Sequence, residues 1–162
     1  MKHPVLLRGL SMHPLVRIII GSSSDEETCR PIQQYLSDFG IDSDFHISSA
    51  HRNPEKTKAL VIEAEQAGIK LFIACAGMAA HLPGVIAALT CLPVIGVPLK
   101  GGSLSGEDAL FSIVQMPPGV PVATVAINGV KNAAVLAAQI LALGDNSIKQ
   151  KLFEYKQKMA ES

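Results

Sequence analysis

The sequence predicts an α/β domain in which a parallel β-sheet is covered on both faces by helices. Its candidate strands are short runs of Ile, Val, Leu and Ala, a pattern typical of strands that are buried on both faces. Segments with helical periodicity alternate with these runs, and such alternation favours a parallel sheet. The length of 162 residues, of which 48% are hydrophobic, suits one domain with an ample core.

Five strands are expected, each followed by a helix. The expected strands cover residues 15–20, 43–48, 70–75, 94–98 and 122–127. The expected helices cover residues 26–39, 54–67, 79–89, 107–114 and 131–143. Because no linker and no internal repeat interrupts this pattern, we expect a single domain over residues 15–145.

Local signals mark several helix ends. Asn53 and Pro54 form a typical helix start, with a capping side chain followed by proline at the first helical position. Gly40 and Gly68 stand where a helix commonly ends in a left-handed residue. Pro31 lacks a donor and crowds the preceding turn, so we expect a kink there or a helix that starts late.

Two segments lie outside the expected domain. Residues 146–162 predict an amphipathic helix whose apolar face is formed by Ile148, Leu152, Tyr155 and Met159. This helix either packs on its own domain or forms an arm that contacts a neighbouring subunit. Residues 1–14 are expected to form a flexible extension without a signal peptide, and a chain start at Met12 is an alternative.

Polar, glycine-containing loops follow the first three expected strands. Five strand–helix units suggest the flavodoxin-like strand order 2-1-3-4-5, with a crevice at the carboxyl ends of strands 1 and 3. The loops GSSSD (21–25), SSAHR (48–52) and AGMAAHLPG (76–84) leave the strands nearest this crevice. We therefore expect the three loops to converge on one ligand site. The long loop after the fourth strand is expected to act as a lid or as a subunit contact.

The first loop has the residue types of an anion site. Ser22 and Ser24 offer hydroxyls, and N–H groups at a helix N-terminus bind phosphate oxygens. Asp25 would repel a phosphate, so it is expected to accept hydrogen bonds from sugar hydroxyls. Helix capping by Ser24 or Asp25 is the alternative. The sequence has neither GxGxxG nor a Walker lysine, which argues against a dinucleotide or ATP site.

The second and third loops add a cation and two histidines. The guanidinium of Arg52 suits a phosphate monoester, and His51 precedes it. His81 stands among apolar residues in the expected first turn of a helix, a position that favours a neutral imidazole and suits a proton shuttle. A histidine with only a structural role is the alternative. Gly77 would let a ligand approach the backbone.

Composition argues against several other functions. The 14 basic and 14 acidic residues cancel and tryptophan is absent, so nucleic-acid binding is not expected. No apolar stretch reaches the ~20 residues that span a membrane, and no cluster has metal-ligand spacing. The cysteines are too far apart in sequence for a zinc or redox motif, which fits a reducing, cytoplasmic setting; they are Cys29, Cys75 and Cys91.

Six co-linear blocks between residues 15 and 143 carry a family resemblance. They read GSSSD, SAHR with Pro54 two residues on, AAHLPG, PVIGVP, SIVQMPPGVPVATVAI and NAAVLAAQIL. In these blocks the chain resembles the N5-carboxyaminoimidazole ribonucleotide mutases, the catalytic subunits of phosphoribosylaminoimidazole carboxylase in purine biosynthesis.

The resemblance implies a three-layer α/β/α flavodoxin-like domain that assembles as an octamer, often with the C-terminal helix reaching a neighbour. It implies an enzyme that moves a carboxylate from the exocyclic nitrogen of an aminoimidazole ribonucleotide to ring carbon C4. It implies no metal, ATP or organic cofactor. A transient contact with the ATP-dependent synthetase that forms the carbamate is a further expectation.

The resemblance also assigns roles by position. The expected ribonucleotide-binding residues are Ser22, Ser24, Asp25, Ser49, Arg52 and Gly77. His81 matches the family's general acid/base, and His51 is expected to support it. Apolar walls are expected to slow the escape of carbon dioxide during the reaction; these are Ala79, Ala80 and Leu82.

Some positions depart from the family's common pattern. Met78 stands where a second glycine is usual, and its backbone is expected to avoid positive φ. Lys100 to Gly102, Glu107 and Pro31 are also unusual. The main rival is a relative that carboxylates aminoimidazole ribonucleotide directly with carbon dioxide, which typically has lysine in place of Arg52. The same fold would also suit a non-catalytic nucleotide-binding domain or a flavin electron carrier.

Overall fold

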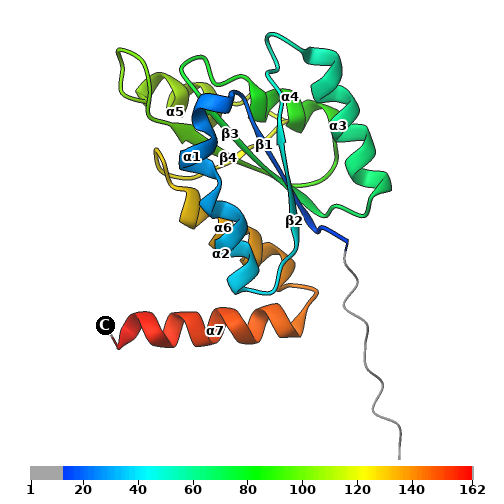
Figure 1. Cartoon of the computed structure of the whole chain (residues 1–162), viewed down its shortest axis with the longest axis vertical. Helices are drawn as coiled ribbons and strands as arrows, with labels where there is room; N and C mark the ends of the chain where they lie inside the picture. Colours follow the sequence, from blue (N-terminus) through cyan, green and yellow to red (C-terminus); the bar gives the residue numbers. More distant parts are fainter. Residues whose placement is uncertain (1–12, 162) are drawn as a thin grey trace, which may run out of the picture.

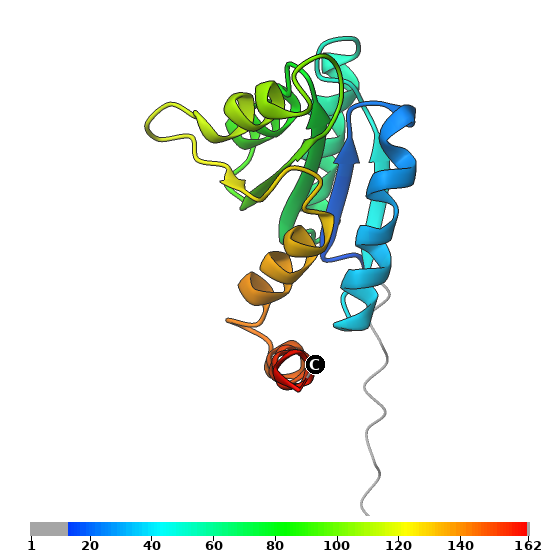
Figure 2. The same cartoon turned by 90° about the vertical axis from the view of Figure 1, so that its left-hand side faces the viewer.

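The structure is a computed structural model that describes residues 13–161, so most of the expected N-terminal extension lies outside the described residues. It contains a five-stranded parallel sheet in the order β2-β1-β3-β4-β5, which confirms the predicted order. The strands are β1 (Val16–Ile20), β2 (Ser43–Ile47), β3 (Leu71–Gly77), β4 (Val94–Leu99) and β5 (Ala123–Thr124). Figures 1 and 2 show this sheet between two layers of helices.

Side chains that alternate along the strands build one core on each face of the sheet. Ile18 and Ile20 on β1 face the core that packs against α1 (Glu26–Cys29), α2 (Pro31–Asp38) and α6 (Val130–Leu141). Ile19, between them, faces the core formed with α3 (Pro54–Gln66), α4 (Leu82–Leu89) and α5 (Glu107–Val114). Both faces of the sheet are therefore covered by helices and shielded from solvent, as the unbroken apolar runs predict.

The helix ends follow the local signals in the sequence. The Asn53 side chain accepts a hydrogen bond from the backbone N–H of Lys56 at 3.1 Å, so it caps α3. Gly40 and Gly68 have φ values of 74° and 84°, as expected for residues that end a helix. The predicted helix over 26–39 is divided at Arg30 into α1 and α2 because Pro31 begins a new helix, which confirms the expected kink.

The fifth strand is much shorter than predicted. Only Ala123 and Thr124 pair with β4 in regular register, whereas the sequence predicted a strand over 122–127. The backbone N–H of Val125 donates to Gly96, but the next bond, to the Pro98 carbonyl at 2.8 Å, comes from Asn128. The segment after β5 therefore contains one extra residue relative to β4, which interrupts the parallel ladder. Asn128 adopts a left-handed backbone, with φ 57°, at this point.

Gly96 on β4 marks a close approach between the sheet and α5. A Cβ at this position would collide with the Cγ2 of Ile113 and would lie 2.8 Å from the Cγ1 of Val122. Since residue 96 has no side chain, α5 packs directly on the strand.

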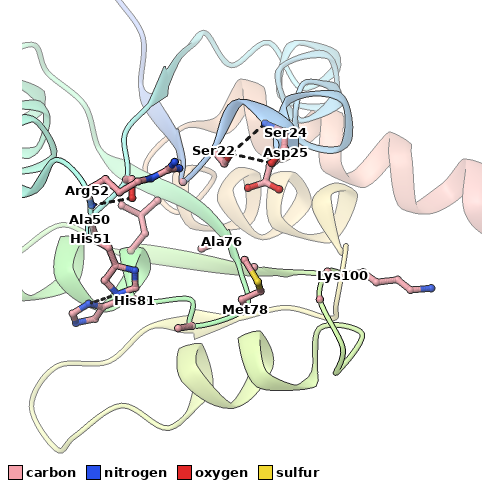
Figure 3. Close-up of a pocket in the computed structure, with 17 residues that line it drawn as sticks. Ser22, Ser24, Asp25, Ala50, His51, Arg52, Ala76, Met78, His81 and Lys100 are labelled. Carbon is pink, nitrogen blue, oxygen red and sulfur yellow. Dashed lines mark hydrogen bonds between the residues drawn. The ribbon is translucent and has the colours of Figure 1, made fainter.

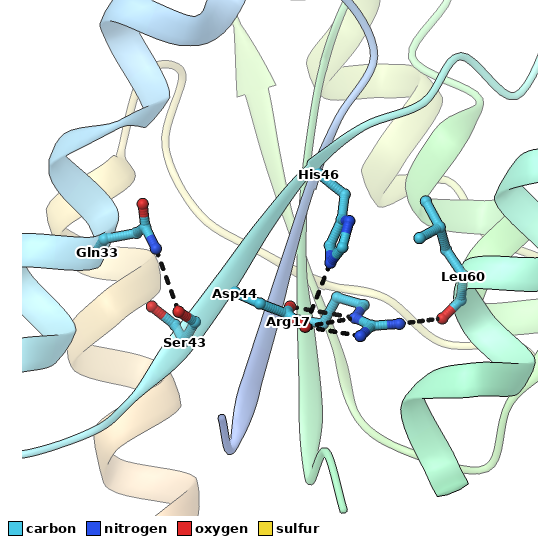
Figure 4. Close-up of polar contacts among 6 residues, drawn as sticks. All are labelled: Arg17, Gln33, Ser43, Asp44, His46 and Leu60. Atoms are coloured by element: carbon cyan, nitrogen blue, oxygen red, sulfur yellow. Dashed lines mark hydrogen bonds and ion pairs between the residues drawn. The ribbon is translucent and has the colours of Figure 1, made fainter. Parts of the chain in front are cut away.

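A buried ion pair connects β1, β2 and α3. Arg17 donates to both carboxylate oxygens of Asp44, the shortest contact being 2.6 Å from Nη2, and its Nη1 donates to the Leu60 carbonyl at 2.7 Å. The Nε2 of His46 lies 3.2 Å from the same carboxylate. Figure 4 shows this network, together with Gln33 of α2, whose amide donates to the Ser43 carbonyl of β2.

The C-terminal helix α7 (Asn146–Ala160) crosses the end of the domain below α2 and α6 in Figure 1. Ile148 and Leu152 are buried in the core shared with α6, and the ring of Tyr155 packs edge-on against Phe39 with centroids 5.4 Å apart. One face of α7 thus packs on its own domain. Its outer side leaves Phe153 exposed.

Candidate active site

A pocket of about 720 Å³ lies at the carboxyl ends of the strands, where the sequence predicted a ligand site. Every predicted site residue lines it, and Figure 3 shows most of their side chains; they are Ser22, Ser24, Asp25, Ser49, His51, Arg52, Gly77 and His81. They come from the loops after β1, β2 and β3, so the predicted convergence of these loops is confirmed.

The first loop turns so that its hydroxyls and its carboxylate border the pocket. Ser22 caps a short 3₁₀ turn over Ser23–Asp25: its Oγ accepts from the backbone N–H and from the hydroxyl of Ser24, at 3.3 and 2.9 Å. The side-chain capping bond of this turn therefore comes from Ser22; Asp25 occupies the N-cap position of α1 but makes no side-chain capping bond. Burial raises the pKa of Asp25 above its ordinary value, and a hydrogen bond with Ser24 partly offsets this.

The second loop presents a cation across from the first. The backbone N–H of Arg52 donates to the Ser49 hydroxyl at 3.2 Å, which fixes the turn before α3. Figure 3 shows the guanidinium extended toward the loop that carries Ser22. An Arg fork facing hydroxyls and N–H groups is suited to the oxygens of a phosphate.

The two histidines of the site contact each other directly. Nδ1 of His81 lies 3.1 Å from Nε2 of His51, and the ring centroids are 5.0 Å apart. A hydrogen bond between two ring nitrogens needs one N–H and one free lone pair, so at least one of the two imidazoles is neutral while the bond exists. The two rings can therefore share the proton in this hydrogen bond and pass it from one ring to the other.

The helix that follows His81 starts later than predicted. The sequence predicted a helix from residue 79, but α4 begins at Leu82 and His81 is its N-cap residue, without a side-chain capping bond. Pro83 explains the late start, because it has no N–H to donate to the Ala79 carbonyl and therefore suits only the first turn of a helix. The imidazole of His81 is consequently free to face His51.

The backbone conformation of Met78 contradicts a second prediction. Its φ is 51°, so a backbone expected to avoid positive φ adopts the left-handed region despite its side chain. The Met78 side chain is 60% exposed and borders the pocket. Figure 3 shows it between Asp25 and Lys100.

The apolar walls agree with the prediction only in part. Ala79 and Leu82 line the pocket, together with Ala50 and Ala76, which were not predicted. Ala80 is almost completely buried in the core under α4 and does not line the pocket.

The loop after β4 also reaches the pocket; it was expected to act as a lid or as a subunit contact, but its residues were not among the expected site residues. Lys100, Gly101 and Gly102 line it, and the Lys100 backbone is held by a 2.8 Å hydrogen bond to Oδ1 of Asn128. A signal was present, since β4 neighbours β3 and its loop begins with a lysine and two glycines. Among residues 13–161, no group of three or more His, Cys, Asp or Glu could hold a metal ion, and no helix is long and apolar enough to cross a membrane.

An open parallel sheet of this strand order, with a polar pocket at its strand ends, places this chain in the flavodoxin-like class of α/β proteins. A family model described as AIR carboxylase matches residues 15–162. The chain belongs to this family.

Similar proteins are found in several organisms. The chain is 53% identical over 146 residues to an N5-carboxyaminoimidazole ribonucleotide mutase of Pyrococcus abyssi, and the match covers 90% of this chain and 84% of the relative. It is 53% identical over 148 residues to a phosphoribosylaminoimidazole carboxylase of Saccharomyces cerevisiae, with 91% of this chain and 26% of the relative covered. The crystal structure of Treponema denticola PurE superposes with a TM-score of 0.85 at 35% identity, covering 91% of this chain and 92% of that one.

Proposed function

We propose that this chain is an isomerase of purine biosynthesis that converts N5-carboxyaminoimidazole ribonucleotide to 4-carboxyaminoimidazole ribonucleotide. The observation that carries the proposal is the contact between His51 and His81, at 3.1 Å, in a pocket also lined by hydroxyls, a carboxylate and an arginine. Relatives that are 53% identical over most of the chain bear the name of this mutase.

The ribose phosphate is held by the residues opposite the histidine pair. Arg52 and the hydroxyls of Ser22 and Ser24 bind the phosphate oxygens, with Ser49 supporting the turn that carries Arg52. Asp25 accepts hydrogen bonds from the ribose hydroxyls. Gly77 lets the ligand lie close to the backbone of β3.

The reaction needs an enzyme group that donates one proton to the carbamate nitrogen and later accepts one proton from ring carbon C4. Protonation of the carbamate nitrogen breaks its C–N bond and yields carbon dioxide and the free aminoimidazole. Ring carbon C4 attacks the carbon dioxide, a C–C bond forms, and a base removes the C4 proton. His81 is the proposed acid and base, and His51 sets its tautomer and can relay its proton. Ala79 and Leu82 slow the escape of the gas.

The test supplies purified protein with N5-carboxyaminoimidazole ribonucleotide, without ATP or added bicarbonate, and follows the C-carboxylated product. His81→Asn and His51→Asn are compared separately, because the contact allows either ring to be the one that meets the substrate. Product formation that is lost in one or both variants supports the mutase. If product forms only from aminoimidazole ribonucleotide and carbon dioxide, the chain is a direct carboxylase.

The cellular setting belongs to the same proposal. We expect a cytoplasmic homo-octamer, the assembly that the family resemblance implies. Three large apolar side chains on α5 and the preceding loop are exposed and could be covered by other copies of the chain; these are Leu104, Phe111 and Val114. The outer face of α7 is available to the same assembly. Light scattering of the purified chain tests the octamer. Cross-linking to the carbamate-forming synthetase tests a transient contact between the two enzymes.

A further inference from the structure

Met78 occupies a backbone conformation that disfavours its own side chain. Its φ of 51° is normally adopted by glycine, and the left-handed region costs other residues about 1–2 kcal/mol. Strain of this kind persists only where the surrounding structure holds it, and it is commonly found at functional sites. The position lies on the pocket, one residue after β3 ends.

The Met78 side chain lies against the loop after β4, the strand next to β3. A Cβ built on Gly102 would lie 3.3 Å from the Cγ and 3.5 Å from the Sδ of Met78, so the thioether packs directly on the Gly102 backbone. Gly102 itself has φ 62°. A Cβ at position 102 would require the Met78 side chain to shift by a few tenths of an ångström.

The loop over residues 100–106 is anchored at both ends. At one end the Lys100 N–H is bonded to Asn128, at 2.8 Å. At the other end Gly106 is enclosed, since a Cβ there would lie 2.9 Å from Cγ2 of Ile127 and 3.2 Å from the Leu99 carbonyl. Between these anchors a Cβ on Gly101 would meet no atom within 4 Å, and Met78 packs on the residue that follows it. The contact thus joins the centre of the loop to the β3 side of the pocket.

We propose that Met78 is a latch that holds the 100–106 loop against the β3 side of the pocket and thereby retains the ligand during turnover. A thioether on a flexible side chain can change rotamer at low cost, which lets the latch release and close again. On the proposed function, which this inference assumes for its second half, the retained species are aminoimidazole ribonucleotide and the small neutral carbon dioxide. Met78 is then a specificity-determining residue that decides how often the intermediate is lost before C4 is carboxylated.

The experiment compares three variants that separate the contact from the strain. Met78→Ala keeps the left-handed backbone strain and removes the contact. Met78→Leu keeps both, and Met78→Gly removes both. The first readout is hydrogen–deuterium exchange of a peptide over residues 100–106 in the full chain without ligand. The second is the partition of N5-carboxyaminoimidazole ribonucleotide between the C-carboxylated product and free aminoimidazole ribonucleotide.

A latch predicts that loop exchange and loss of the intermediate both rise at least about fivefold in the Ala and Gly variants, and less than about twofold in the Leu variant. Unchanged loop exchange in the Ala variant overturns the latch. Faster exchange with an unchanged partition shows a contact with only a structural role, and it also overturns the proposal. If the unsubstituted chain forms no product, the proposed function fails, while loop exchange still decides whether Met78 holds the loop.

Discussion

The ion pair of Arg17 and Asp44 offers a quantitative test of the packing between β1, β2 and α3. Replacing Asp44 with alanine removes three of the four hydrogen bonds that the Arg17 side chain makes and leaves only the bond to Leu60. The Arg17 side chain is 7% exposed, so its charge would remain buried without a counterion, whereas the Asp44 side is 25% exposed. Loss of one partner from a fully buried pair costs about 3–5 kcal/mol. Water entering from the Asp44 side reduces the expected loss to about 2–4 kcal/mol.

Urea unfolding at fixed chain concentration measures this loss, and a fall in Tm of about 4–16 °C accompanies it. The matched control replaces both partners, Arg17→Met with Asp44→Leu, because an apolar pair of similar volume often restores the stability of a buried ion pair. Two results would refute the reasoning. One is a loss below about 1 kcal/mol in Asp44→Ala, and the other is a double variant as unstable as the single one.

Three further predictions concern the pocket and the core. Asp25→Asn should abolish ligand binding, seen by calorimetry with aminoimidazole ribonucleotide, while slightly raising Tm at neutral pH. Because burial raises the pKa of Asp25, the folded chain binds the Asp25 proton more tightly than the unfolded chain does, and it loses stability as pH rises above the ordinary value of 3.8. The difference in Tm between the unsubstituted chain and the Asp25→Asn variant should therefore shrink toward acid pH. A thiol reagent should label Cys91 rapidly in the folded chain and the buried Cys29 and Cys75 only on unfolding, since a hydrogen bond with the Cys29 thiol and burial raise the pKa of Cys75. Rapid labelling of two thiols would contradict this. Gly96→Ala should lower the free energy of unfolding by about 1–3 kcal/mol through overpacking against α5, and an unchanged urea midpoint would show that the helix moves freely.

The sheet and most of the pocket could be predicted because their signals are local. Unbroken apolar runs define buried strands, and short polar residues at strand ends have no reason to be there unless they cap a helix or bind a ligand. Ser22 does both. The strand order then brings separate loops together, so Asp25, Arg52 and His81 could be assigned to one pocket from the sequence alone.

The features that escaped prediction depend on tertiary contacts. The contact between His51 and His81 joins residues 30 apart in the sequence, and the ring orientation follows from where α4 begins. The left-handed backbone of Met78 contradicts its intrinsic preference and is compatible with the facing glycine at position 102. β5 shortens because its ladder bonds depend on β4 and on Asn128, not on the apolar run alone.

The brevity of β5 bears on how the chain behaves when it is concentrated. An edge strand with many free N–H and C=O groups is a template for a strand from another molecule, and such pairing leads to fibrils. Here one edge of the sheet pairs regularly over only two residues. At the other edge, the side chains of Gln33 and Lys56 already occupy the Ser43 and Ile47 carbonyls of β2. Concentrated solutions of the chain are therefore expected to associate through side-chain surfaces, without the growth of cross-β aggregates.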